Sequence, residues 1–324
     1  MSEATVNMTK SFVYLCEGVS HDEKLMKMLE NEKFDVGISE AFDICGLGIF
    51  EILKIPATIA TFSGVHIDCV SKSIGEPITP ASWSTKGDRM NFLGRLENFI
   101  NVLLGNIFFT RTYNEEIKVF RAKIWASSSK DMIASFVFTN SNPYLDYPRP
   151  VLHKTVAIGG IAVAEWDDIL NKRNTTVLVS FGSVVKSVYM PDQYKLESGT
   201  TDSRLTVFIT HGGLGSITEL AHMGKPAILA SQNYNTSHIT ELPFFLQIPI
   251  FADQTRNANM FSKHGCGIVL TKRELEHPQK LRDSLIKIFN DTSFSDNARL
   301  LSEILRNQPI SPKQLLVKHS EFAA

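Results

Sequence analysis

Hydrophobic and polar positions along the chain form two successive series in which short apolar runs alternate with helical patterns. The runs of the first series lie at 34–38, 56–62, 134–139 and 155–160. The runs of the second series lie at 175–183, 205–209 and 227–229. Short apolar runs bounded by turn residues are typical of buried strands, and strands that alternate with helices are typical of βαβ units around a parallel sheet. The pattern therefore predicts an α/β protein.

Between 84 and 135 the pattern is helical, and apolar residues recur there at intervals of three and four. This apolar stripe consists of Phe92, Leu93, Leu96, Phe99, Ile100, Leu103 and Leu104. We expect the stripe to face the core rather than a cofactor. The most apolar window, 99–109, is much shorter than the roughly 20 residues of a membrane-spanning helix. We interpret it as a buried helix, with a segment lying in a membrane interface as the alternative.

Turn and cap residues mark further elements. The segment 140–150, NSNPYLDYPRP, is rich in proline and aromatic residues, and we expect a surface loop there. Thr271 with Glu274 predicts a capping box. Ser311, followed by a proline, predicts the start of a final helix that runs to the last residue.

The length of the chain favours two domains, because 324 residues exceed what a single core usually accommodates. A polar stretch at 164–174 precedes the strong apolar run at 175–183. We therefore place an N-terminal domain at 1–162 and a C-terminal domain at 163–324.

Composition excludes several classes of function. The chain has 33 basic and 34 acidic residues, which argues against a nucleic-acid partner. The four cysteines lie far apart without a CxxC pair, so the sequence indicates neither a zinc site nor a disulfide scaffold. We expect no metal site. The first ten residues are polar and acidic, unlike a secretory signal.

A glycine-rich loop follows the run at 205–209. The glycines Gly212, Gly213 and Gly215 allow backbone N–H groups to approach an anion closely, and the helix that follows adds its positive end. We expect that helix over 216–223, with Ser216 at its N-cap. The loop lies at the carboxyl edge of the sheet, where parallel α/β folds bind ligands. It therefore predicts a phosphate site.

Two ionisable side chains beside the loop have alternative interpretations. Glu219 could accept both hydroxyls of a ribose, or be a first-turn acid favoured by the helix dipole. His211 could donate to a diphosphate or bond a loop carbonyl. The loop lacks the third glycine of the dinucleotide fingerprint and the Gly-Lys pair of a P-loop, which disfavours a nicotinamide oxidoreductase. The chain also lacks GxSxG, which disfavours a hydrolase.

The segment FITHGGLGSITELAHMGKP, followed by IPIFADQTRNA, resembles the signature of the UDP-glycosyltransferases, specifically their UDP-glucuronosyltransferase branch. Further matches are TVLVSFGSV, NSNPYLDYPRP, FDVGISEAFDICG and the C-terminal segment, which is most similar to nematode members. The resemblance implies a B-type glycosyltransferase fold, in which two Rossmann-like domains face each other. The first would bind the acceptor and the second the UDP-sugar.

The resemblance also implies a set of residues for the UDP-sugar site. These are Ser183, His211, Gly212, Gly213, Gly215, Ser216, Glu219, Asp253 and Gln254. Ser183 and the glycine loop would hold the diphosphate, and Glu219 would hold the ribose. Asp253 and Gln254 would bond the sugar hydroxyls. Two alternatives stay open: Ser183 as an ordinary turn serine, and Asp253 as the cap of a helix that begins near Thr255.

In this family a histidine of the acceptor domain acts as general base, and an acid orients it. Glu40 matches the orienting acid, and a solvated loop acid is the alternative. The base histidine is not found, since its usual segment lies well upstream of the strand that begins near Phe34. We expect His21 to be a surface histidine.

The chain departs from the family pattern at several places, so we expect both domains to be incomplete. The first βα unit of the acceptor domain is expected to be missing. A deletion near 196–201 removes the loop that stacks on uracil and should damage the sheet. An insertion at 230–247 interrupts a strand, and the family's C-terminal membrane helix is expected to be absent.

The resemblance implies transfer of a glucuronosyl or glucosyl group, with inversion, from UDP-glucuronate or UDP-glucose to a small lipophilic acceptor. It implies no cofactor besides this donor, and a location at the endoplasmic reticulum membrane. The departures favour an alternative, a catalytically inactive short form. Such a chain would at most bind UDP or form oligomers with full-length relatives.

Overall fold

A computed structural model describes residues 3–65, 68–77, 80, 81, 84, 87–124, 134–163, 176–180, 206–231 and 253–324. Three expectations fall outside these residues. They concern Ser183, the deletion near 196–201 and most of the insertion at 230–247. The boundary between the domains at 162 and 163 stays a prediction, because residues 164–175 also lie outside.

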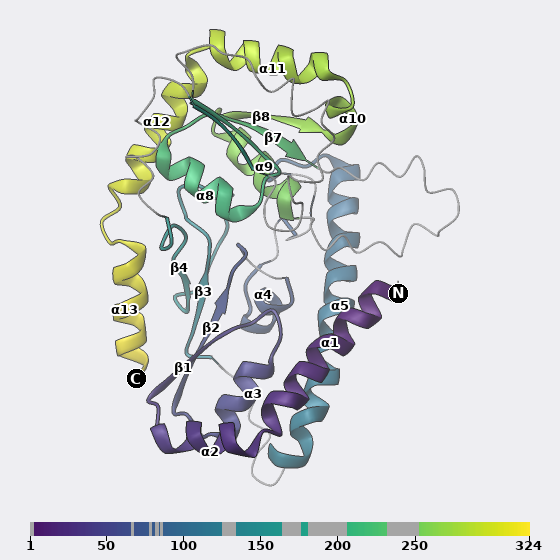
Figure 1. Cartoon of the computed structure of the whole chain (residues 1–324), viewed down its shortest axis with the longest axis vertical. Helices are drawn as coiled ribbons and strands as arrows, with labels where there is room; N and C mark the ends of the chain where they lie inside the picture. The colour runs from purple at the N-terminus through teal and green to yellow at the C-terminus, as the bar shows by residue number, and fades with distance from the viewer. Residues whose placement is uncertain are drawn as a thin grey trace.

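The N-terminal part of the chain builds a parallel sheet of order β1-β2-β3-β4 (Figure 1). Its strands are β1 Val36–Glu40, β2 Ala57–Phe62, β3 Phe136–Thr139 and β4 Thr155–Ala157. Its helices are α1 Glu3–Ser20, α2 Glu23–Glu32, α3 Cys45–Ile52, α4 Asp68–Ile74 and α5 Phe92–Ile124. The four strands expected from the first series are confirmed, whereas α1 was not expected. Within the described residues no strand precedes β1.

The C-terminal part builds a second parallel sheet, of order β5-β6-β7-β8. Its strands are β5 Thr176–Ser180, β6 Thr206–Thr210, β7 Ala227–Ser231 and β8 Gly267–Thr271. Its helices are α8 Leu214–Met223, α9 Asp253–Lys263, α10 Lys272–Leu275, α11 Pro278–Asn290 and α12 Ser293–Arg306. The capping box at β8 is confirmed, since Thr271 N–H donates to Glu274 Oε2 over 2.8 Å.

The expected damage between β5 and β6 is wrong. The two strands pair in parallel over their whole length, from Thr176 opposite Thr206 to Ser180 opposite Thr210. The connection between them, residues 181–205, exceeds the dozen or so residues that a parallel crossover needs. The sheet therefore closes across the position where the deletion was expected to disrupt it.

The last helix, α13 (Pro312–Ala323), packs on the first sheet rather than the second (Figure 1). Ser311 caps it with a complete capping box, as expected. Leu315 and Leu316 contact the buried cluster of β2, β3 and β4, and the His319 ring meets that of Phe136 edge-on, with 5.0 Å between ring centroids. The end of the chain thus ties the second half of the molecule to the first.

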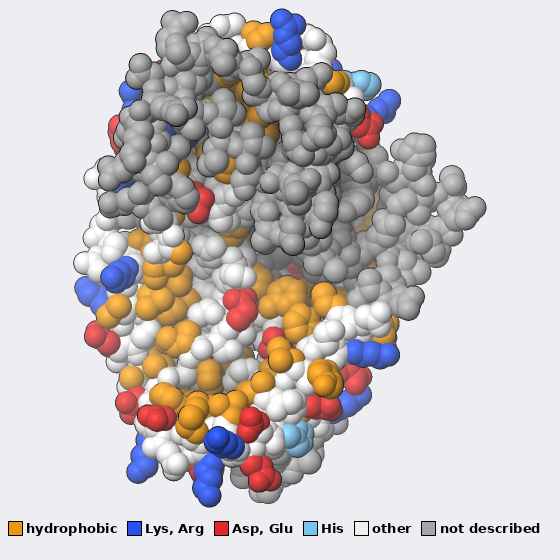
Figure 2. Space-filling view, in the orientation of Figure 1, with side chains coloured by type: hydrophobic (Ala, Val, Ile, Leu, Met, Phe, Trp, Pro, Cys, Tyr) orange, Lys and Arg blue, Asp and Glu red, His pale blue; other side chains and the backbone are white. Residues whose placement is uncertain are grey.

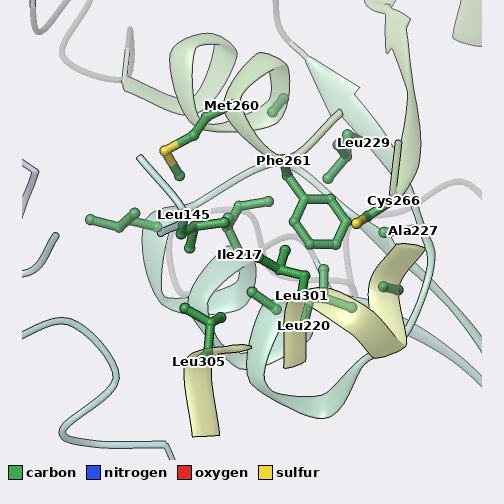
Figure 3. Packing of buried hydrophobic residues seen from close by; sticks show 14 of the residues in the cluster. Leu145, Ile217, Leu220, Ala227, Leu229, Met260, Phe261, Cys266, Leu301 and Leu305 are labelled. Atoms are coloured by element: carbon green, nitrogen blue, oxygen red, sulfur yellow. The ribbon is translucent and has the colours of Figure 1, made fainter. Parts of the chain in front are cut away.

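The segment 140–150, expected as a surface loop, instead joins the two halves. Leu145 and Tyr147 are only 2% and 3% exposed, and they belong to the large core cluster of the second half (Figure 3). Arg256 of α9 donates to Asp146 over 2.6 Å, and both side chains are buried. The Arg256 guanidinium also lies 5.1 Å from the centre of the Tyr147 ring. The aromatic residues that suggested an exposed loop therefore mark an interface between domains.

The expected orientation of the α5 stripe is also wrong. Phe92 is 79% exposed and Phe99 is 57% exposed, whereas Phe108, Phe109 and Phe120 are buried. In the first half of α5 the small or polar residues Gly94, Asn98 and Gly105 face inward. Helical spacing shows that the apolar residues share one face of the helix, but it does not show which face of the helix packs against the core. This half has many other exposed apolar side chains, and its visible face carries apolar patches (Figure 2). Within the described residues no helix could span a membrane.

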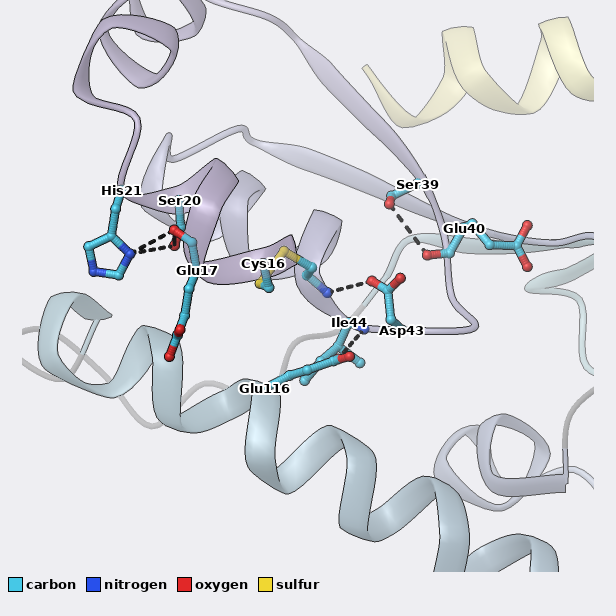
Figure 4. Close-up of a disulfide and its surroundings, with 10 residues drawn as sticks. Cys16, Glu17, Ser20, His21, Ser39, Glu40, Asp43, Ile44 and Glu116 are labelled. Carbon is cyan, nitrogen blue, oxygen red and sulfur yellow. Dashed lines mark hydrogen bonds between the residues drawn. A yellow bond between two sulfur atoms is a disulfide. The ribbon is translucent and has the colours of Figure 1, made fainter. Parts of the chain in front are cut away.

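The structure contains a disulfide that the sequence did not indicate. Cys16 of α1 is bonded to Cys45, the first residue of α3 (Figure 4). The two cysteines are 29 residues apart and belong to no CxxC pair, and the packing of α1 beside α3 brings them together. Cys69 and Cys266 are buried free thiols.

Candidate functional site

The glycine loop connects β6 to α8 at the carboxyl edge of the second sheet. Helix α8 begins at Leu214 with Gly213 at its N-cap, so the expected N-cap role of Ser216 is wrong and Ser216 lies within the first turn. The C-terminus is as expected: Gly224 has a φ of 64°, and its N–H donates to the Leu220 carbonyl. Because α8 begins earlier, Gly215 lies in its first turn, where backbone N–H groups lack partners within the helix.

Each glycine of the loop has a different surrounding. Gly212 has a φ of 86°, and a Cβ there would lie 2.7 Å from the Gln254 carbonyl oxygen. A Cβ on Gly213 would lie 2.7 Å from the His211 ring, whereas a Cβ on Gly215 would meet nothing within 4 Å. Gly212 therefore allows a close approach between chain segments, and Gly215 leaves open space at the start of α8.

Asp253 and Gln254 lie beside this loop, because α9 begins at Asp253 and the Gln254 backbone packs against Gly212. The alternative of a helix that begins near Thr255 with Asp253 as its cap is wrong. Asn257, one turn later, donates from Nδ2 to Asp253 Oδ2 over 3.1 Å. Burial raises the pKa of Asp253 and is only partly offset by this hydrogen bond. The structure thus brings the expected sugar-binding pair against the expected phosphate loop.

A cavity of about 280 Å³ lies between the two halves. It is lined from the first half by Glu40, Thr61, Phe62, Ser63, Phe138, Asn140, Ile158, Gly160, Ile161, Ala162 and Val163, and from the second by Gly215, Thr218 and Glu219. Strand ends of the first sheet thus face the first turns of α8. Its ionisable lining side chains, among the described residues, are the two carboxylates.

Glu219 reaches this cavity from α8. Its side chain is half-buried and forms no hydrogen bond or ion pair to the described residues. Burial raises its pKa, and no donor or cation among the described residues offsets this shift. A carboxylate left without a donor beside an open glycine is suited to accept hydroxyl groups from a ligand.

Glu40 is the last residue of β1 and lines the cavity on the wall opposite Glu219. The Ser63 backbone N–H donates to Glu40 Oε1 and Oε2 over 3.1 and 3.2 Å, and Ser63 Oγ lies 3.4 Å from Oε1. Burial raises the pKa of Glu40, while the bonds from Ser63 oppose the shift. Figure 4 shows its carboxylate extending away from Asp43 and from the disulfide. Glu40 is therefore a half-buried residue of the cavity lining, held at the end of a strand by Ser63.

The described histidines lie outside the cavity lining. His211 lies over Gly213, with Nδ1 3.5 Å from Thr210 Oγ1, and is half-buried. His21 is exposed, as expected, with Nδ1 2.8 Å from the Glu17 carbonyl.

Comparison with known proteins gives a decisive match. A family model described as UDP-glucoronosyl and UDP-glucosyl transferase matches residues 1–196 and 202–324. The chain belongs to this family. The break in the match coincides with the expected deletion.

Curated relatives in the family include ugt-55 of Caenorhabditis elegans, which is 26% identical over 89% of this chain and 64% of its own length. The rat UDP-glucuronosyltransferase 1A1 is 26% identical over 95% of this chain and 63% of its own length. The chain therefore spans less than two thirds of these relatives.

Solved structures share the fold. The glycosyltransferase of kitacinnamycin superimposes with a TM-score of 0.59 at 14% identity, covering 99% of this chain and 84% of that one. Spinosyn rhamnosyltransferase SpnG, complexed with thymidine diphosphate, gives 0.55 at 15% identity, covering 98% and 82%. The UDP-glycosyltransferase chain thus has the expected B-type glycosyltransferase fold, with two Rossmann-like halves.

Two side chains of this UDP-glycosyltransferase were missed in the sequence. Asn257 holds the Asp253 carboxylate, and Ser63 holds that of Glu40. The i, i+4 spacing of Asp253 and Asn257 on one helix could have revealed the first pair. The second joins the ends of two neighbouring strands, β1 and β2, and only the register of the sheet reveals it.

Proposed function

We propose that the chain binds a UDP-sugar in its C-terminal half and transfers the sugar to a small lipophilic acceptor. The observation that supports this most is the meeting of Gly212 with Gln254, since it joins the phosphate loop to the sugar-binding pair. The N–H groups at the start of α8 would hold the diphosphate. The fold relative SpnG, complexed with thymidine diphosphate, supports a nucleoside diphosphate ligand.

In this proposal Glu219 accepts the ribose hydroxyls, while Asp253 and Gln254 select the sugar. A carboxylate and an amide together offer acceptors and donors to adjacent hydroxyls, and buried polar groups of this kind discriminate strongly among ligands. The names of the curated relatives favour a glucuronosyl group over a glucosyl group. Ser183, His211 and Ser216 complete the proposed diphosphate site.

The acceptor would occupy the cavity between the halves, whose walls are largely apolar. Its nucleophile would attack the anomeric carbon from the side opposite UDP, which gives inversion. We extend the proposal to the endoplasmic reticulum membrane and to oligomers with relatives. Family membership supports this location, and the Cys16–Cys45 disulfide fits an oxidising compartment.

A second candidate function is UDP binding without transfer. The absence of a histidine among the described lining residues favours it, because the family's general base is a histidine. The two candidates differ in turnover and not in UDP affinity.

Titration of the purified chain with UDP, followed by a UDP-release assay with a phenolic acceptor, tests both candidates. Transfer predicts binding and release, whereas the second candidate predicts binding alone. Glu219→Ala should weaken UDP binding at least tenfold, since hydrogen bonds to a charged group contribute about 1.5–3 kcal/mol. Glu303→Ala, which removes an exposed carboxylate of α12, is the matched control. Unchanged UDP affinity in Glu219→Ala would refute the ribose assignment.

A further inference from the structure

We propose that the Glu40 carboxylate is itself the general base of the sugar transfer, rather than a group that orients a histidine. The inference rests on the proposed function and assigns a step of the reaction at the same cavity. It differs from the family pattern in that the proton passes directly from the acceptor to a carboxylate.

The position of Glu40 suits this role. It ends β1 at the carboxyl edge of the first sheet, and it lines the cavity whose opposite wall carries Gly215 and Glu219. An acceptor between these walls would lie between Glu40 and the proposed donor site. A base must come within hydrogen-bond reach of the proton that it removes, and Glu40 is the one ionisable described side chain that the first half contributes to the lining.

The bonds to Glu40 fix its carboxylate without occupying it fully. Ser63 supplies a backbone N–H that both oxygens share and a hydroxyl near one of them. An ionised carboxylate has about four acceptor sites. Lone pairs therefore stay available for the hydroxyl of an acceptor.

The surroundings of Glu40 also adjust its proton affinity. Burial is the largest effect and raises its pKa, and the charge of Asp43 acts in the same direction. The donors of Ser63 lower its pKa. Glu219, on the opposite wall, is also acidic, and no described lining residue carries a positive charge. A carboxylate whose pKa is raised toward neutrality is a better base than an exposed one.

The acceptor oxygen forms a bond to the anomeric carbon, and the bond from that carbon to the β-phosphate oxygen of the UDP-sugar breaks. The bonding electron pair leaves with UDP, and the acceptor proton moves to Glu40. Because the hydroxyl becomes more acidic as it attacks, a carboxylate can accept its proton in the transition state. Solvent then removes the proton from Glu40.

The test measures transfer from UDP-glucuronate and UDP-glucose to phenol and to the more acidic 4-nitrophenol. Glu40→Gln keeps an oxygen for Ser63 but cannot accept the proton, so kcat should fall about 100-fold or more. KM for the donor and Kd for UDP should not change. The loss should be smaller with 4-nitrophenol, which needs less help from a base. Formate should restore part of the activity of Glu40→Ala. In the wild type, kcat/KM should rise with pH with an apparent pKa above the 4.3 or so of an exposed glutamate.

The matched control is Glu51→Gln, which changes an exposed carboxylate on α3 and should retain wild-type kcat. Glu40→Gln activity within about threefold of wild type would overturn the base assignment and leave the proposed function intact. Equal losses with both phenols and no rescue by formate would also overturn it, because they indicate positioning alone. A wild type that binds UDP but transfers to neither phenol would refute the proposed transfer itself.

Discussion

The two walls of the cavity are built in different ways. On the C-terminal side the backbone sets the geometry of the loop that leads to the lining residue Gly215, since Gly212 adopts a left-handed φ and lies against the Gln254 carbonyl. On the N-terminal wall one side chain, Glu40, depends on its bonds to Ser63. A site built from backbone atoms is suited to the diphosphate, because every UDP-sugar donor contains that group. A wall built from side chains can change with the acceptor, as is common for loops on a rigid scaffold.

The ion pair between Asp146 and Arg256 joins the two halves of the molecule, and breaking it should have the largest effect. In Asp146→Ala the buried Arg256 would lose its partner, which typically costs about 3–5 kcal/mol. The side chain of Arg256 is 4% exposed and that of Asp146 is 6% exposed, so water cannot replace the lost carboxylate. Chemical denaturation would measure the loss in the free energy of unfolding.

Asp296→Ala is the control for this prediction, because the Asp296–Arg299 pair is exposed on α12. Its loss should cost about 0.5 kcal/mol or less. Similar destabilisation by the two substitutions would show that the buried ion pair does not hold the two halves of the molecule together.

The backbone origin of the C-terminal wall can be tested by adding a single methyl group. Gly212→Ala places a Cβ against the Gln254 carbonyl and forces alanine into a left-handed conformation, which alone costs roughly 1–2 kcal/mol. We expect a loss of about 2 kcal/mol in stability together with loss of UDP binding. Thermal denaturation and UDP titration would measure the two effects.

Gly215→Ala provides the matched comparison in the same loop. Its Cβ would enter open space within α8, where alanine is favoured over glycine by about 0.5–1 kcal/mol. The variant should be at least as stable as the wild type. A loss of stability equal to that of Gly212→Ala would contradict the assignment of the strain to Gly212.

The sequence predicted the parts of the fold that depend on local patterns. The strands of the first sheet, the strands β5, β6 and β7 of the second, and the caps at Gly224 and Ser311 follow from spacing and residue type, whereas β8 was not expected. The glycine loop and Asp253 with Gln254 were assigned to one site through the family resemblance, and the structure brings them together.

The sequence could not predict features that depend on how elements meet. The stripe from Phe92 to Leu104 has the periodicity of a core helix, yet the sheet lies on another side of α5. Leu145 and Tyr147 were expected on the surface because the second half, which covers them, is distant in sequence. The Cys16–Cys45 pair and the bond from Ser63 to Glu40 likewise need tertiary contacts.

The N-terminal half contains another carboxylate with a raised pKa, Glu116, which lies away from the cavity lining and is buried in the core, whereas Glu40 lines the cavity. Glu116 of α5 is fully buried and accepts the Ile44 N–H over 2.8 Å at the start of α3, while its Oε1 has no hydrogen-bond partner. Burial raises the pKa of Glu116 to about 7, and the charge of Asp43 adds to the shift.

This shift predicts a pH-dependent stability. In the unfolded chain the pKa of Glu116 returns to about 4.3, so the folded chain binds more protons between that pH and about 7. The free energy of unfolding should therefore fall as pH rises through this window and level off above it. Glu116→Gln keeps an oxygen for Ile44 and removes the charge, so it should be about 3 kcal/mol more stable than wild type at pH 8. At pH 4 the two should be nearly equal. Glu115→Gln, at the neighbouring exposed position, should keep the wild-type pH dependence. If Glu116→Gln were less stable than wild type at pH 8, the surroundings would stabilise the charged form of Glu116, and the prediction would be wrong.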